Sequence, residues 1–255
     1  MNNTINIETF NEYTSITLNR VRDKNSLNIE MLNELNGVLD MLEEKNSCKI
    51  VVLKGRDGYF CSGMDFNEIV SPLNENNQQG KLFCLQYMRL LKRINNSAIT
   101  FISVVDGSVT AGGVGIISAS DIVIATPNSR FNLSEALWGL LPSMVLPFLI
   151  RRVGYQAAYK MTLTTLPVVA EEALRIHLVD EISENPEISV NPIIKRLLRI
   201  KQSTIGEIKS YFNQVYEIPL EIEKLSVSTT FNLISNPVIK KNISDFIEFK
   251  KFPWE

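Results

Sequence analysis

Histidine and cysteine are scarce in this sequence, and neither occurs in a pattern that would build a metal or thiol centre. The 255 residues contain one histidine, His177, and three cysteines, Cys48, Cys61 and Cys84. The cysteines are odd in number, widely spaced and without a CxxC pair, which excludes a disulfide framework or a zinc set and fits a reducing compartment. We therefore expect no metal and no redox cofactor, and a small buried apolar role for Cys61.

Long apolar runs and an excess of one charge are missing as well. The run from Met144 to Ile150 is far shorter than the roughly 20 residues that span a bilayer, and the polar stretch from Met1 to Phe10 has no signal-peptide core. A formal net charge of -2 argues against binding nucleic acid by charge neutralisation. We expect a cytoplasmic protein that binds neither membranes nor nucleic acid.

The apolar pattern along the first half predicts alternating strands and helices in a largely parallel α/β layout. A polar stretch from Leu73 to Gly80 is predicted to be a surface loop, and Asn28 can cap the first helix. The predicted strands are Tyr13–Leu18, Lys49–Lys54, Ile99–Val105 and Ile122–Ala125, and the predicted helices are the leucine-rich segment Leu32–Leu42, then Lys81–Ile94 and Val114–Ala119.

After Arg151 the pattern becomes mostly helical, and no internal repeat or strong linker interrupts the chain. Helical spacing of apolar residues is found at Gln156–Leu163, Ala170–Ile176, Pro192–Lys201 and Ser226–Ile234. We expect a single domain whose C-terminal third packs on its own β/α core or on another subunit.

Two glycine turns, each following an apolar strand, carry the chemical signal. They are Tyr59–Phe66, which reads YFCSGMDF, and Gly107–Gly115, which reads GSVTAGGVG. A glycine permits a sharp turn, and a helix that follows it points free amides toward the turn. If the amides of Met64 and Gly112 converged on a thioester oxygen, they would stabilise an enolate. Each turn alone is also consistent with a purely structural bend, and neither has the spacing of a nucleotide-binding loop.

The order and company of these motifs resemble the crotonase, or enoyl-CoA hydratase, superfamily over most of the chain. The motifs are Phe60–Phe66, then Asp106-Gly107 with Ala111-Gly112-Gly113, then Ser134–Pro142. The resemblance implies a core of ββα turns in two sheets followed by a helical C-terminal region. It places the thioester site in residues 1–190 and trimer contacts in residues 191–255 of the same domain, and it implies a homotrimer or a hexamer.

The stretch from Phe131 to Gly154 and the segment Phe252–Glu255 look similar to one branch of that superfamily. This branch contains the hydratase-like dehydratases of polyketide β-branching cassettes. The resemblance implies loss of water from a 3-hydroxy-3-methylglutaryl thioester, held on an acyl carrier protein, to give the 3-methylglutaconyl thioester. Coenzyme A or phosphopantetheine would arrive as part of the substrate, and no separate cofactor is implied.

Carried over residue by residue, the resemblance makes Met64 and Gly112 the oxyanion donors and Glu135 one of the two glutamates of the hydratases. Gly115 falls on the other glutamate, which is a departure from the pattern. Glu135 would then remove the α-proton and return it to the departing hydroxyl, or shuttle a proton between carbons as an isomerase does. We expect Leu133, Ala136, Leu137 and Trp138 to surround it and raise its pKa.

Several neighbouring residues have both a functional and a structural interpretation. Asp65 could protonate the leaving group, but its place after the glycine turn also suits an N-cap. Trp138 is expected to be pocket wall or core. Ser62, Gly63 and Gly113, in the two turns, are expected to contact substrate.

Charged side chains elsewhere are candidates for the substrate handle. Arg22 and Lys24 lie in a segment that resembles the family loop near the phosphopantetheine phosphate, although a solvated turn explains them equally well. Lysines 240, 241, 250 and 251 could meet an acidic carrier protein or simply keep the surface hydrated. His177 stands where the family usually has a helix-ending glycine, and we expect a structural or solvent-facing role.

Three other functions stay open on the sequence alone. A general enoyl-CoA hydratase or isomerase would use the same oxyanion donors and Glu135. The decarboxylase of the same cassettes would not need Glu135 for α-proton removal. A non-catalytic binding protein would keep only the fold. For the glutaryl substrate, a basic side chain should face the distal carboxylate, and the sequence does not identify it.

Overall fold

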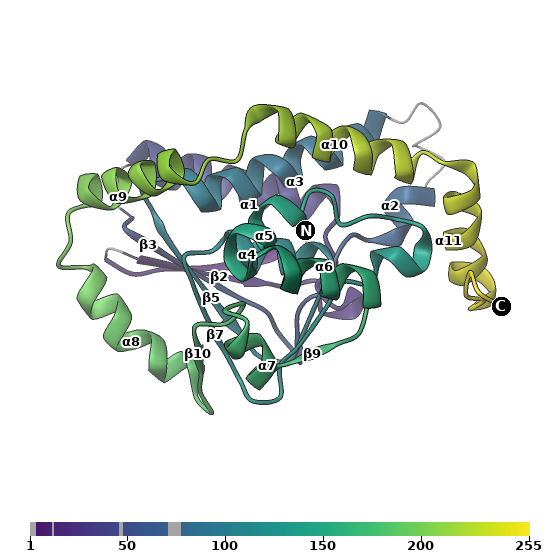
Figure 1. Cartoon of the computed structure of the whole chain (residues 1–255). Helices are drawn as coiled ribbons and strands as arrows, with labels where there is room; N and C mark the ends of the chain where they lie inside the picture. The colour runs from purple at the N-terminus through teal and green to yellow at the C-terminus, as the bar shows by residue number, and fades with distance from the viewer. Residues whose placement is uncertain (1–3, 12, 46–47, 71–77) are drawn as a thin grey trace.

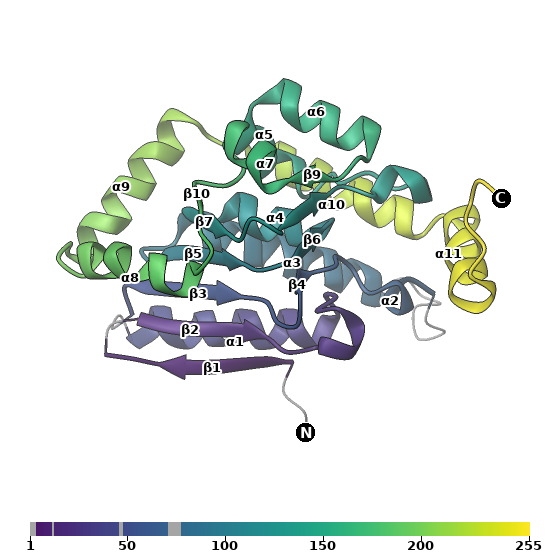
Figure 2. The same ribbon diagram turned by 90° about the horizontal axis from the view of Figure 1, so that it is seen from below.

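The structure is a computed structural model that describes residues 4–11, 13–45, 48–70 and 78–255. A six-stranded sheet forms its base (Figure 2), with the strand order β1-β2-β3-β5-β7-β10. The first pair is antiparallel and the others are parallel. The strands are β1 (Ile5–Thr9), β2 (Tyr13–Leu18), β3 (Ile50–Lys54), β5 (Thr100–Val105), β7 (Ile122–Ala125) and β10 (Glu181–Ile182).

A second sheet contains four short strands in the order β4-β6-β8-β9. Along the chain, these strands lie between strands of the large sheet. They are β4 (Tyr59–Cys61), β6 (Ser108–Thr110), β8 (Arg130–Asn132) and β9 (Val168–Val169). Each of β3, β5 and β7 lies in the large sheet and is followed directly by a strand of the small one. This repeated pair, followed by a helix, confirms the predicted crotonase-like ββα core with its C-terminal helices.

Helices follow each strand pair and form most of the C-terminal half (Figure 1). Two short 3₁₀ helices, η1 (Val21–Asp23) and η3 (Glu135–Trp138), lie beside the turns. The α-helices are α1 (Ile29–Lys45), α2 (Phe66–Val70), α3 (Gln78–Asn96), α4 (Gly112–Ala119), α5 (Leu146–Val153), α6 (Tyr155–Thr164), α7 (Ala170–Arg175), α8 (Pro186–Leu197), α9 (Gln202–Val215), α10 (Leu220–Ile234) and α11 (Pro237–Phe249).

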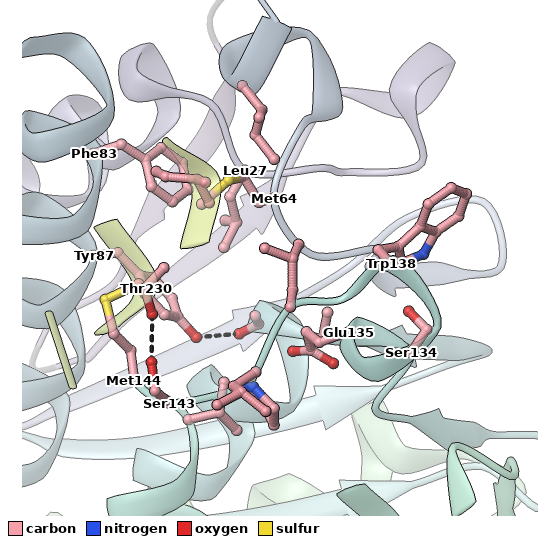
Figure 3. Close-up of a pocket in the computed structure, with 18 of the residues that line it drawn as sticks. Leu27, Met64, Phe83, Tyr87, Ser134, Glu135, Trp138, Ser143, Met144 and Thr230 are labelled. Carbon is pink, nitrogen blue, oxygen red and sulfur yellow. Dashed lines mark hydrogen bonds between the residues drawn. The ribbon is translucent and has the colours of Figure 1, made fainter. Parts of the chain in front are cut away.

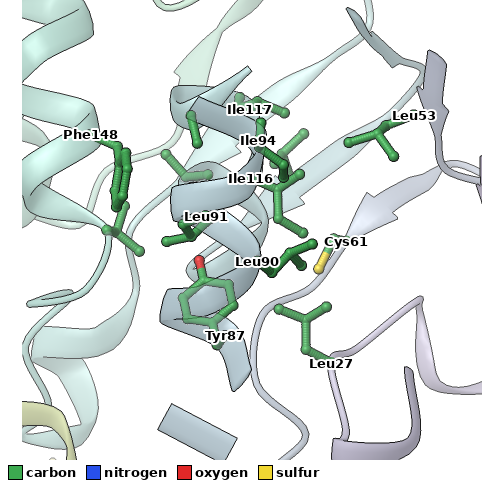
Figure 4. Close-up of a cluster of buried hydrophobic side chains, with 14 of the residues drawn as sticks. Leu27, Leu53, Cys61, Tyr87, Leu90, Leu91, Ile94, Ile116, Ile117 and Phe148 are labelled. Atoms are coloured by element: carbon green, nitrogen blue, oxygen red, sulfur yellow. The ribbon is translucent and has the colours of Figure 1, made fainter. Parts of the chain in front are cut away.

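The inner strands β3, β5 and β7 of the large sheet are buried on both faces, which explains why they are largely apolar runs. The main core lies between the sheet and helices α1, α3 and α4, where Leu90, Ile94 and Ile116 pack together (Figure 4). The opposite face is a separate cluster in which Val190 and Ile194 of α8 cover strand residues. No helix of the described residues is long and apolar enough to cross a membrane.

The predicted elements of the first half are confirmed, with shifts at their ends. The strands at Tyr13–Leu18 and Ile122–Ala125 match β2 and β7, and the side chain of Asn28 accepts a hydrogen bond from the amide of Met31 at the start of α1. Gln78–Gly80, predicted as loop, belong instead to α3, and residues 71–77 of that prediction lie outside the described residues.

Three of the four helical segments predicted after Arg151 are confirmed by α6, α7 and α10. The fourth, Pro192–Lys201, has the wrong bounds, because α8 ends at Leu197 and a new helix begins at Gln202. Pro192 lies inside α8, so it did not mark the helix start. The proposed division of the chain at residue 190 falls within α8, whose Val190 is buried against the sheet.

A buried lysine joins α9 to the rest of the molecule. The Nζ of Lys209 donates hydrogen bonds to the carbonyl oxygens of Ile94 and Ile99 at 2.8 and 2.9 Å, and to Oδ2 of Asp121 at 2.8 Å. Its side chain is only 8% exposed. Burial lowers the pKa of Lys209, and the charge of Asp121 opposes this. The three acceptors compensate the cation for the water it has lost.

Replacing this lysine should therefore destabilise the fold much more than replacing an exposed one. We expect Lys209→Met to lower the free energy of unfolding by about 3–5 kcal/mol, because it leaves Asp121 without its cation and two carbonyls without a donor. Urea unfolding followed by circular dichroism measures this loss, with the exposed Lys201→Met as control. Equal midpoints for both variants would contradict the structural role of Lys209.

Candidate active site

One pocket collects the chemically active residues predicted from the sequence (Figure 3). Its wall is mostly apolar, and its polar groups come from both glycine turns, from η3 and from α10. The residues that line it are Leu27, Ser62, Met64, Phe66, Ile69, Phe83, Tyr87, Ala111, Gly112, Ser134, Glu135, Trp138, Leu140, Leu141, Pro142, Ser143, Met144, Val145, Thr230 and Ile234. An apolar cavity with a few convergent polar groups is the usual form of a small-molecule site.

The backbone amides of Met64 and Gly112 are available to a ligand in this pocket. Gly112 opens α4, whose first amides have no carbonyl partner within the helix. Within the part of the chain that the structure describes, neither amide donates a hydrogen bond. A carbonyl oxygen between such donors would be stabilised as it gained negative charge.

Gly63 and Gly113, predicted as substrate contacts, do not line the pocket; instead they let the two turns approach each other. Gly63 has a φ of +89°, and a Cβ there would lie 2.7 Å from the Cβ of Ala111 and 3.3 Å from the Gly112 nitrogen. A Cβ on Gly113 would lie 2.6 Å from the carbonyl oxygen of Cys61. Only glycine fits at these points, so both residues allow the two turns to lie close together.

Glu135 is the only carboxylate among the described residues that line the pocket. The residue as a whole is half-buried, but its Oε2 is completely buried and has no hydrogen-bond partner among the described residues. Burial raises the pKa of Glu135 to about 7, against a small opposing effect of its own backbone. A carboxyl group with this pKa can take up and release a proton near neutral pH.

The apolar surroundings predicted for Glu135 are only half correct. Leu133 and Trp138 are buried, but Ala136 and Leu137 point outward from η3 and are exposed. Trp138 lines the pocket and belongs to an aromatic cluster with residues Phe66, Phe246, Phe252 and Trp254. It is therefore both pocket wall and core.

Asp65 is placed as a structural residue. Its Oδ1 accepts a hydrogen bond from the Asn67 amide at 3.0 Å, and its Oδ2 is 2.7 Å from the guanidinium of Arg20. It does not line the pocket. The capping interpretation is confirmed by this geometry, and the suggested role in protonating the leaving group is not supported, because both oxygens already have partners.

The predicted phosphate contacts lie beside the pocket, outside its wall. Arg22 and Lys24 are exposed on η1 and the turn after it, and the Nζ of Lys24 lies 5.4 Å from the centre of the Tyr59 ring. Ser62, which lines the pocket, contacts this loop through a hydrogen bond from its Oγ to the carbonyl of Asp23 at 3.4 Å. The loop therefore borders the side of the pocket where Ser62 lies.

No basic side chain lines the pocket within the described residues, which differs from the expected cation for a distal carboxylate. Sequence reasoning also missed Tyr87 and the pair Ser143 and Thr230, whose hydroxyl oxygens are 2.6 Å apart (Figure 3). The spacing of Phe83 and Tyr87 on one face of α3 was a usable signal. No pattern in the sequence pointed to Thr230, because this residue reaches the pocket from a helix that is distant in the sequence.

His177 and Cys61, for which we expected structural roles, do not line the pocket. His177 is exposed and has a φ of +64°, which explains why a glycine suits this position in the family. Cys61 is fully buried, and burial raises the pKa of its thiol to about 12. Among the described residues no group of three metal-ligating side chains could hold a metal ion.

Comparison with known proteins places this fold and pocket in one class, the crotonase superfamily. The model of the enoyl-CoA hydratase/isomerase family matches residues 8–255. The bacillaene synthase dehydratase PksH of Bacillus subtilis is 33% identical over 240 residues, covering 94% of this chain and 92% of that protein. An enoyl-CoA hydratase of Mycobacterium tuberculosis is 30% identical over 66% of this chain and 63% of its own.

The solved structures agree with this placement. A crystal structure from Bacillus subtilis, described as a putative polyketide biosynthesis enoyl-CoA hydratase, has a TM-score of 0.88 and 30% identity. The match covers 98% of this chain and 99% of the other. The chain belongs to the enoyl-CoA hydratase/isomerase family and is an enzyme of its hydratase and dehydratase type, a hydro-lyase.

The pKa of Glu135 yields a prediction for both activity and stability. We expect Glu135→Gln to lower kcat/KM about 100- to 10,000-fold, as loss of a general base does. Wild-type kcat/KM should rise with pH through an apparent pKa of about 7, because the base must be ionised. Tyr87, the other titratable side chain of the wall, has a pKa raised well above its ordinary value and does not interfere.

Ionisation of Glu135 has opposite effects on activity and on stability: activity rises with pH, and the stability of the fold falls. The folded protein binds the Glu135 proton more tightly than an exposed glutamate with a pKa of 4.5, so stability is lost as the pH rises toward about 7. Glu135→Gln should therefore be more stable than wild type at pH 8 and equal to it near pH 4. Thermal melts across this range, with the exposed Glu171→Gln as control, measure the difference. Parallel pH profiles for wild type and Glu135→Gln would contradict the raised pKa.

Proposed function

We propose that this enzyme removes water from a 3-hydroxyacyl thioester, with carrier-bound 3-hydroxy-3-methylglutaryl as the substrate and 3-methylglutaconyl as the product. The observation that carries the proposal is the buried, unpartnered Oε2 of Glu135 in the same pocket as the two free amides of Met64 and Gly112. One carboxylate with a pKa of about 7 and an oxyanion site are sufficient for this elimination.

In the proposed reaction Glu135 handles a single proton twice. Its carboxylate takes the proton from the α-carbon, and the electron pair moves onto the thioester carbonyl, where the amides of Met64 and Gly112 hold the oxyanion. The enolate electrons then form the double bond and expel the hydroxyl from C3. The protonated Glu135 gives its proton to that hydroxyl, so water leaves and the carboxylate is restored.

The comparison with PksH supports the carrier-bound substrate. That relative, which matches 94% of this chain, is described as a dehydratase of bacillaene synthase. The exposed Arg22 and Lys24 beside Ser62 suit the phosphate of a phosphopantetheine arm that would enter on this side of the pocket. The exposed Lys241, Lys250 and Lys251 suit an acidic carrier protein.

A second candidate, hydration of an uncharged enoyl-CoA, is favoured by one observation. Within the described residues the pocket wall carries no lysine or arginine to pair with a glutaryl carboxylate. Ser143 and Thr230 are the polar groups of the wall contributed from the α5 side and α10, but Ser143 already donates to the carbonyl of Ser226 at 2.9 Å. An uncharged acyl group would need no cation in the pocket wall.

We also propose assembly into a homotrimer or hexamer. Large apolar side chains on α6 and α9 are more than half exposed in the single chain: Tyr155, Leu163, Tyr211, Phe212 and Val215. Apolar surface of this extent is more typical of a contact between subunits than of a solvated face. Light scattering coupled to gel filtration measures the state in solution, and a monomer at micromolar concentration would contradict the assembly.

We place this enzyme in the cytoplasm. Cys48, Cys61 and Cys84 are all free and buried, with no disulfide between them. A reducing compartment keeps thiols in this state.

The two candidate substrates are separated by one assay. We expect purified protein to remove water from 3-hydroxy-3-methylglutaryl on a carrier protein, seen by mass spectrometry as the loss of one water. Crotonyl-CoA should be hydrated at least about tenfold more slowly, the ratio that corresponds to roughly 1.4 kcal/mol of selectivity. Glu135→Gln should be inactive on both.

Each other outcome selects a different function. Turnover of crotonyl-CoA alone would replace the dehydratase with the general hydratase. Loss of carbon dioxide from a 3-methylglutaconyl thioester, retained in Glu135→Gln, would identify the decarboxylase of such cassettes. Binding of thioester without any turnover would identify a non-catalytic protein.

A further inference from the structure

Tyr87 lines the pocket and contacts one of the two glycine turns (Figure 3). It comes from the middle of α3, one helical turn after Phe83, and is 2% exposed. Its hydroxyl donates a hydrogen bond of 2.6 Å to the carbonyl oxygen of Gly112. The residue that supplies a free amide to the pocket is thus held at its carbonyl by Tyr87.

The same hydroxyl explains why residue 115 is a glycine. A Cβ at Gly115 would lie 2.1 Å from the hydroxyl oxygen of Tyr87, and a Cβ at Gly112 would lie 3.4 Å from it. A contact of 2.1 Å is a severe overlap, so any side chain at Gly115 would displace the phenol from Gly112. The tyrosine and a side chain at position 115 therefore exclude each other.

The phenol is suited to a constant, neutral role. Burial raises the pKa of Tyr87 well above its ordinary value, and the charge of the nearby Glu135, when ionised, adds to this effect. The hydroxyl therefore keeps its proton at any working pH and remains a donor to Gly112. It cannot serve as a second acid or base beside Glu135 in the neutral range.

We propose that Tyr87 is a positioning residue, which fixes Gly112 as an oxyanion donor and keeps position 115 empty, so that Glu135 acts as the sole carboxylate. This inference rests on the proposed function and extends it. It also accounts for the absent second glutamate. The neutral hydroxyl of Tyr87, which donates to Gly112, occupies the space that a side chain at position 115 would need. Catalysis then depends on how firmly the phenol holds the turn.

The first test removes only the hydroxyl. We expect Tyr87→Phe to lower kcat by about 10- to 100-fold with a change in KM of less than about threefold, because removing an oxyanion donor outright costs about 100- to 1,000-fold. The apparent pKa near 7 of the activity profile should remain, since it belongs to Glu135. Tyr216→Phe, at the exposed C-terminal end of α9, is the matched control.

A second test uses the overlap at position 115. Gly115→Ala should lower kcat in wild type by pushing the phenol off Gly112, and it should cost several-fold less in the Tyr87→Phe background, where the hydroxyl is gone. The remaining contacts of the new Cβ, with the Val145 side chain at 3.1 Å and with Cζ of the ring at position 87 at 3.3 Å, are common to both backgrounds. Additive effects of the two substitutions on kcat would overturn the proposal.

A binding readout separates this inference from the proposed reaction. An acetoacetyl thioester on the carrier protein forms an enolate when its carbonyl is held by an oxyanion site, and the enolate is detected by its ultraviolet absorbance. We expect wild type to enolise the bound probe. Tyr87→Phe should enolise it at least about fivefold less, because the Gly112 amide is then held less firmly. Equal enolisation in both would overturn the role of Tyr87 and leave the proposed function standing. No enolisation in wild type would overturn both.

Discussion

The site depends on how closely two backbone turns approach each other. Gly63 and Gly113 leave no room for a side chain, with a Cβ of Gly63 only 2.7 Å from Ala111 and one of Gly113 only 2.6 Å from the carbonyl of Cys61. This contact brings the start of α4 beside the turn after β4. Because the approach is made by main chain, packed backbone rather than a flexible side chain sets the positions of the Met64 and Gly112 amides, and the buried Tyr87 hydroxyl supports the second turn at the Gly112 carbonyl.

Among the described residues that line the pocket, Glu135 is the only one with an acidic or basic side chain, and this fact decides the electrostatics of the site. Glu135 has no cation or hydrogen-bond donor at its buried Oε2 within the described chain, so burial has the largest effect on its pKa and its own backbone opposes that effect. Asp65 and Arg20 neutralise each other outside the wall, at 2.7 Å. A single group that titrates near neutrality, in neutral surroundings, suits a proton that is taken up and returned by the same carboxylate.

The sequence predicted the backbone of the site better than its side-chain lining. Motifs around Met64, Gly112 and Glu135 are local, since short apolar strands and glycines are visible in one stretch of chain, and the structure brings these three residues together. Contributions from α3 and α10 are not local: Tyr87 resembles a core tyrosine and Thr230 an ordinary helix residue until the fold is known. Apolar residues continue past the end of α8 at Leu198 and Ile200, which is why the end of that helix was misplaced.

The pocket wall is assembled from segments that are synthesised far apart in time. Both glycine turns and Glu135 lie before residue 136, whereas Thr230 and Ile234 belong to α10. A nascent chain that has released its first 200 residues from the ribosome thus contains the reactive groups but not the wall that α10 supplies. The pocket wall is therefore complete only after α10 has been synthesised and has packed on the rest of the chain.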